Sequence, residues 1–145
     1  ADFMDFVFFD ELSPQRLKGD KSKIKKYQLK PYDIALSIRG TTPKFTILSP
    51  KLKNNKVVAN AGIIIMRSPT PEIAIGLYCY LFSTQGQKAL GKIYERNLGS
   101  INPPDLEQLA IPDDFCANAQ ETFRQIQSYA KELKVLQSKL QALRG

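Results

Sequence analysis

In the first half of the chain, apolar and polar positions alternate with the period of two that is typical of β-strands. The pattern runs through "DIALSI" (residues 33–38) and resumes in "FTIL" (45–48) after a short polar connection. The β-branched residues in "VVANAGIIIMR" (57–67) form the strongest strand signal. The aromatic-rich opening "FMDFVFFDELSP" predicts a further buried strand or short helix. These segments predict a small mixed or antiparallel sheet.

The pattern changes to helical periodicity after the "SPTP" segment. Thr70 is a good N-cap with Pro71 at the first helical position, and "EIAIGLYCYLFS" is apolar enough for a largely buried helix. A second helix is expected to start near Ser83, run through "QGQKALGKIYE" and end before "RNLGS". Asn102, followed by two prolines, predicts a short helix or turn that closes at Pro112.

The last segment, from about Cys116 to Leu143, predicts one long amphipathic helix. Its apolar residues recur every three or four positions, with a shift of phase near Leu133. At 1.5 Å per residue it would extend roughly 40 Å, more than so small a domain needs for its own core. Packing back on the domain is one interpretation, but we favour a partner helix, because the exposed end would otherwise leave leucines in water. The residues expected to face that partner are Phe123, Ile126, Leu133, Leu136, Leu140 and Leu143.

The expected fold class is therefore α+β, a small sheet with packed helices followed by one long, coiled-coil-like C-terminal helix. Residues 1–114 are predicted to form the globular domain and residues 115–145 the spacer or dimerisation helix. A length of 145 residues is ordinary for one domain with a core of its own.

Charge distinguishes the two halves of the sequence. The net charge is +7, and all of the excess lies in residues 1–67, which hold 13 Lys and Arg against 6 Asp and Glu. Residues 68–145 hold 8 of each sign. Such asymmetry favours a surface that faces a polyanion, although charge that only keeps the protein soluble is the alternative.

The sequence lacks residues and motifs that several kinds of catalysis and metal binding require. There is no histidine, which removes the usual general base and most zinc sites, and no phosphate-binding loop, nucleophile elbow or C-x-x-C motif occurs. Cys79 and Cys116 are expected to be buried free thiols of a reducing compartment. No segment has the roughly 20 apolar residues that cross a bilayer. We therefore expect a cytoplasmic protein without catalytic residues, bound metal or cofactor.

The "RGTTPK" connection between the first two predicted strands is the clearest candidate binding segment. It gathers two cations, two hydroxyls and turn amides, groups that contact phosphates or base edges. A tight turn without a ligand is the alternative interpretation. Aromatic residues are not interleaved with the basic ones, so duplex DNA fits better than single strands. The candidate DNA-binding residues are Arg39, Thr41, Thr42 and Lys44 of this segment, Lys21, Lys23, Lys25 and Lys26 upstream, and Arg96, Asn97 and Ser100 of "RNLGS".

An ordered series of motifs resembles the target recognition domains of type I restriction–modification specificity subunits. "LKPYDIALSIRGTTPKF" is similar to that family's Gly-Asp-Ile and Arg-Gly segment, and "NAGIIIMR" to its following strand. "YCYLFSTQGQKAL", "NLGSINPPDLEQLAIP" and "AQETFRQIQSYAKELKVLQSKL" resemble its later helices and the proline-ended passage between them. The resemblance spans roughly residues 29–143. The family's Gly-Asp is here Tyr32-Asp33, and its Gly-Lys is Pro43-Lys44.

The resemblance implies a function as well as a fold. The globular part would read one half of a split duplex DNA target in the major groove. The long helix would pair with a second such helix or dock on a DNA methyltransferase subunit or domain. Methylation with S-adenosylmethionine, and any endonuclease activity, would belong to that partner in a prokaryotic cytoplasm. The chain would be a half subunit or the C-terminal recognition domain of a fused adenine methyltransferase. A protein–protein adaptor that acts through the helix alone is the alternative.

Overall fold

The computed structural model describes residues 29–40, 43–50 and 62–145, and it has the α+β fold that the sequence predicts. Three strands form an antiparallel sheet, and helices follow them along the chain. The strands are β1 (Ile34–Ser37), β2 (Phe45–Ile47) and β3 (Ile63–Met66). The helices are α2 (Pro71–Phe82), α3 (Thr84–Arg96), α4 (Pro103–Glu107) and α5 (Ala119–Leu143).

The sheet has the strand order β2-β1-β3, so the first described strand lies in the middle. Leu36 is opposite Phe45 on one side and Ile64 on the other. Ile34 and Leu36 are fully buried, as the alternating pattern predicts, and Ala35 between them is buried too. A central strand buried on both faces needs apolar or small residues at every position, and β1 meets that requirement.

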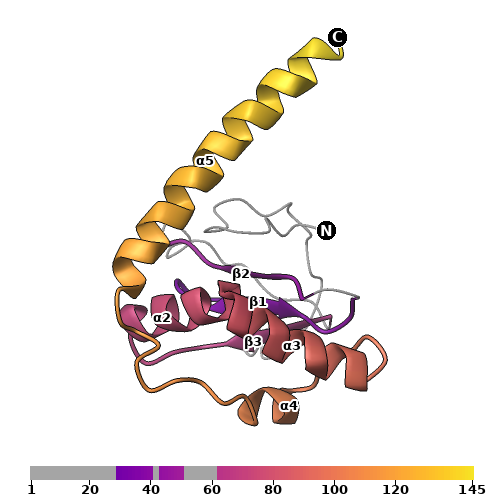
Figure 1. The fold of residues 1–145 in the computed structure, drawn as a ribbon, viewed down its shortest axis with the longest axis vertical. Helices are drawn as coiled ribbons and strands as arrows, with labels where there is room; N and C mark the ends of the chain where they lie inside the picture. The colour runs from indigo at the N-terminus through magenta and orange to yellow at the C-terminus, as the bar shows by residue number, and fades with distance from the viewer. Residues whose placement is uncertain (1–28, 41–42, 51–61) are drawn as a thin grey trace, which may run out of the picture.

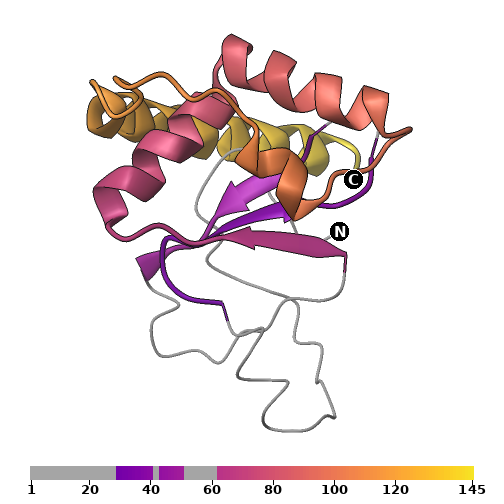
Figure 2. The same cartoon turned by 90° about the horizontal axis from the view of Figure 1, so that it is seen from below.

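The helices lie on one side of the sheet, as Figure 2 shows. Helix α2 supplies Tyr78, which is fully buried and packs edge to face against Phe45 of β2 and Phe123 of α5. The predicted start of α2 is confirmed, because the Thr70 hydroxyl accepts a hydrogen bond from the Ile73 amide. The core of the domain therefore lies between the sheet and the helices α2, α3 and α5.

A sharp corner joins α2 to α3. Ser83 caps α3 by accepting a hydrogen bond from the Gly86 amide, and its hydroxyl donates to the Tyr80 carbonyl. A Cβ atom at Gly86 would lie only 1.9 Å from that carbonyl oxygen, so only glycine fits here. The corner confirms the predicted break between two helices near Ser83.

Helix α5 begins against the domain and then leaves it, as Figure 1 shows. Ala119, Phe123 and Ile126 belong to the hydrophobic core. Phe123 and Ile126 were expected to face a partner, and the structure corrects this, because α2 and its neighbours already bury both side chains. The remaining predicted partner residues are exposed: Leu133, Leu136, Leu140 and Leu143.

Both cysteines are free, but their surroundings differ from the expectation of two buried thiols. Cys79 is half-buried beneath the first turn of α5, with its Sγ 3.5 Å from the Ala119 carbonyl oxygen. Burial raises the pKa of Cys79 to about 11, and the neighbouring Cys116 contributes in the same direction. Cys116 itself is exposed, so burial was the wrong prediction for this residue.

Two of the expected secondary-structure elements fall at least partly outside the part of the chain that the structure describes. These are the strand or short helix expected in "FMDFVFFDELSP" and the start of the third predicted strand, before Gly62. Within the described residues, no helix combines the length and the apolar character needed to cross a membrane.

Candidate nucleic-acid interface

The end of β1 lies beside the loop that follows α3, although the two segments are about sixty residues apart in sequence. Arg39 forms an antiparallel bridge with Ser100. The Gly40 amide donates to the Gly99 carbonyl at 3.1 Å, and the Ile101 amide donates to the Ile38 carbonyl at 2.9 Å. The structure thus brings together two groups of residues that the sequence analysis proposed separately, around Arg39 and around Ser100.

Lys44 lies on the same side of the domain as Arg39, at the start of β2. Its carbonyl accepts a hydrogen bond from the Ser37 amide at 2.9 Å, which fixes it across from the last residue of β1. The side chains of Arg39 and Lys44 are both exposed. Thr41 and Thr42, which complete the "RGTTPK" segment, lie outside the described residues, as do Lys21, Lys23, Lys25 and Lys26.

The backbone that carries Arg39 is held from two directions. The Ser37 hydroxyl donates to the Arg39 carbonyl at 2.8 Å. The buried Tyr94 of α3 donates its hydroxyl to the Ser37 carbonyl, and desolvation raises the pKa of that phenol to about 12. Tyr94 therefore stays a hydrogen-bond donor at physiological pH, and it joins α3 to the end of β1.

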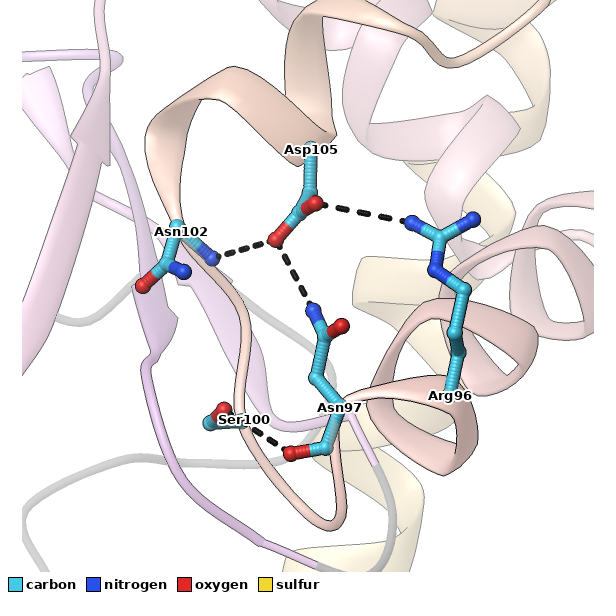
Figure 3. Close-up of polar contacts among 5 residues, drawn as sticks. All are labelled: Arg96, Asn97, Ser100, Asn102 and Asp105. Carbon is cyan, nitrogen blue, oxygen red and sulfur yellow. Dashed lines mark hydrogen bonds and ion pairs between the residues drawn. The ribbon is translucent and has the colours of Figure 1, made fainter.

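The loop after α3 is organised around the carboxylate of Asp105, shown in Figure 3. Asp105 Oδ2 accepts hydrogen bonds from Asn97 Nδ2 at 2.9 Å and from the Asn102 amide at 3.0 Å. A guanidinium nitrogen of Arg96 lies 3.5 Å from Asp105 Oδ1. Asp105 is the first-turn acid of the short helix α4, where a carboxylate also stabilises the positive end of the helix.

This network assigns different roles to the three candidate residues of the loop. The Asn97 side chain is engaged with Asp105, and the Ser100 hydroxyl donates to the Asn97 carbonyl at 3.2 Å (Figure 3). Both side chains therefore hold the loop in shape. Arg96 is 60% exposed and its hydrogen bond to Asp105 is long, at 3.5 Å, so its guanidinium keeps donors for another group.

An ion pair with a buried carboxylate, which the sequence analysis did not anticipate, connects the start of β1 with the residue after β3. Asp33 is 1% exposed, and Arg67 binds it with two hydrogen bonds, Nε to Oδ1 at 2.9 Å and a terminal nitrogen to Oδ2 at 2.8 Å. The Lys30 amide donates to the same carboxylate at 2.8 Å. The hydrogen bonds to Asp33 raise the pKa of Arg67. Asp33 thus holds together the start of β1 and the segment that follows β3.

A second unanticipated feature is the tip of the loop. Leu98 is 97% exposed and has a φ of 57°, in the left-handed region that leucine seldom adopts. The only sequence signal was its position in a polar turn, between Asn97 and Gly99.

The described residues offer no obvious site for a metal ion. No group of three His, Cys, Asp or Glu side chains among them lies close enough together to hold one. What the site does present is a set of exposed cations, Arg39, Lys44 and Arg96, on a backbone fixed by hydrogen bonds.

Comparison of the chain with models of protein families found no match, and comparison with curated proteins found none either.

Proposed function

We propose that this chain is a sequence-specific double-stranded DNA-binding module, the target recognition domain of a type I-like restriction–modification system. It reads DNA and carries no catalytic residues. A methyltransferase that is associated or fused supplies methylation with S-adenosylmethionine, and the complex acts in a prokaryotic cytoplasm.

The observation that carries the proposal is the bridge between Arg39 and Ser100. It joins the Arg-Gly segment and the "NLGS" passage, two separate parts of the resemblance, into one exposed basic edge. Cations on a rigid strand end are suited to fix a protein on the phosphate backbone. Fixed loop backbone beside them gives base-reading side chains a defined position.

The backbone at Tyr32 supports the resemblance independently. Tyr32 occupies the place of the family's glycine in the Gly-Asp pair, and its φ is 65°, a conformation that glycine adopts most easily. The residue that follows, Asp33, is the buried carboxylate that holds Arg67. The "YD" of this chain therefore has the backbone shape and the acid that a Gly-Asp motif would require.

Fluorescence anisotropy with random duplex DNA in rising salt tests the proposal. The double variant Arg39→Ala and Lys44→Ala should bind more weakly, and the slope of log K against log salt should become less negative by about two, one for each phosphate that is no longer neutralised. The matched control is Lys134→Ala and Lys139→Ala, which removes the same charge from the distal part of α5 and should leave the slope unchanged. Absence of duplex binding at low salt would refute the proposal.

A protein–protein adaptor is the second candidate, and the four exposed leucines of α5 favour it. An adaptor would show equal, weak DNA binding in both double variants above. It would lose its protein partner when those leucines are replaced.

A further inference from the structure

Leu98 is the most exposed large apolar side chain among the described residues, at 97%. It lies at the tip of the loop between α3 and the bridge of Arg39 with Ser100. Exposed single leucines are common on proteins, so exposure alone would mean little. Its backbone makes this leucine unusual.

Leu98 occupies the position just past the end of a helix where glycine is the rule. The Gly99 amide donates to the Tyr94 carbonyl at 2.7 Å, and the Leu98 amide donates to the Glu95 carbonyl at 3.3 Å. These are the two hydrogen bonds of a Schellman motif, whose left-handed residue is usually glycine because a side chain there is strained. Leucine at this position neither improves the helix end nor buries its own surface.

The loop nevertheless holds Leu98 in a defined place. Gly99 is hydrogen-bonded to Gly40, and Asn97 is bonded to Asp105 (Figure 3). Leu98 therefore lies on a fixed loop, two residues before Ser100, which forms the bridge with the exposed Arg39. A strained, exposed residue on a rigid frame is characteristic of a site where function outweighs stability.

We propose that Leu98 is a specificity-determining residue that contacts the methyl group of a thymine in the major groove. This inference rests on the DNA-binding function proposed above. Thymine is the one unmodified base that shows an apolar group in that groove, and aliphatic side chains recognise it by contact. The neighbouring cations bind phosphates of any sequence, so Leu98 adds a preference that they cannot provide.

The test uses a duplex that the 145-residue chain itself selects from a random pool. Each thymidine of that duplex is replaced in turn by deoxyuridine, which removes only the methyl group. The parent should lose affinity roughly fourfold at one position, the worth of one buried methyl group. L98G should bind the original duplex about fourfold more weakly and be insensitive to deoxyuridine at that position.

Two controls keep the result interpretable. L98G places glycine where the motif favours it, so its melting temperature should equal or exceed that of the parent. L140A removes an equally aliphatic, exposed side chain from α5 and should keep the full sensitivity to deoxyuridine.

The outcomes separate this inference from the function on which it rests. A parent that binds its selected duplex but is insensitive to deoxyuridine at every position overturns the role of Leu98 and leaves DNA binding intact. The same conclusion follows if L98G stays as sensitive as the parent. A parent that binds no duplex overturns both proposals.

Discussion

The two ends of helix α5 carry apolar side chains at similar spacing but lie in different surroundings. In the proximal half, residues 119–130, the apolar stripe is buried against the domain, with Phe123 packed on Tyr78. In the distal half, residues 131–143, every residue is exposed, including four leucines. At 3.6 residues per turn, the distal stripe is rotated by about a quarter turn from the core-facing side.

This difference separates the part of the helix that completes the core from the part that lies outside it. The proximal half completes the core that α2 and the sheet leave open. The distal half contributes no burial to the described domain, and its leucines would stay in water unless another chain covers them. A domain boundary at residue 114 therefore separates the globular part from three of its own core residues.

The largest effect is expected in the proximal half. Phe123→Ala should lower the free energy of unfolding by about 3–5 kcal/mol, because it opens a cavity beside the rings of the core. Denaturant unfolding followed by circular dichroism measures this loss. Leu140→Ala, at a side chain that is 63% exposed, should change the same quantity by less than about 0.5 kcal/mol. Equal losses of unfolding free energy in the two variants would contradict the difference between the buried proximal half and the exposed distal half.

The second effect concerns the thiol beneath the first turn of α5. With a pKa of about 11, Cys79 has roughly a hundredfold less thiolate near pH 8 than a thiol of pKa 9.0, so alkylation should be slow while α5 stays docked. Raising the pH through 11 should accelerate it. The exposed Cys116 should react first, and mass spectrometry of digested samples distinguishes the two sites. Rapid modification of Cys79 at pH 8 would mean that the proximal half detaches readily.

Local sequence predicts where the helices and strands begin, but it does not predict which half of α5 is buried. The starts of α2 and α3 were predictable because caps such as Thr70 and Ser83 act on amides three residues away. Strands β1 and β2 were predictable from alternation within a few residues. For α5, periodicity predicted a helix, but whether Phe123 meets its own domain or another chain depends on where α2 lies.

The candidate site likewise depends on contacts that local sequence does not predict. Arg39 and the "RNLGS" turn were each proposed from local composition, but their contact is a bridge across the fold that no local pattern encodes. The pair of Asp33 and Arg67 joins residues 34 positions apart. Leu98 was missed because an apolar residue in a turn carries no chemical signal until its backbone angle and exposure are known.

The third effect lies in the distal half. The resemblance implies that this stripe pairs with a second such helix or docks on a methyltransferase. If it pairs with a second copy, Leu136→Glu combined with Leu140→Glu should weaken self-association at least about tenfold. Sedimentation velocity over a concentration series measures it. Lys134→Glu makes the same change in net charge on another face of the helix and should associate like the parent. If the parent stays monomeric over the whole concentration series, self-association is excluded, and the distal half would have to bind a different protein, such as the methyltransferase.

The smallest expected effect on stability comes from an exposed ion pair, which stabilises the helix itself and not its packing on the domain. Glu121 and Arg124 form an exposed ion pair at 2.9 Å, three residues apart on the outer side of the proximal half. Pairs of this kind stabilise a helix by about 0.2–0.5 kcal/mol, so Arg124→Ala should change the unfolding equilibrium no more than about twofold. The difference should vanish in high salt, because exposed charges are screened. A loss comparable with that of Phe123→Ala would mean that the helix itself, and not its buried stripe, holds α5 on the domain.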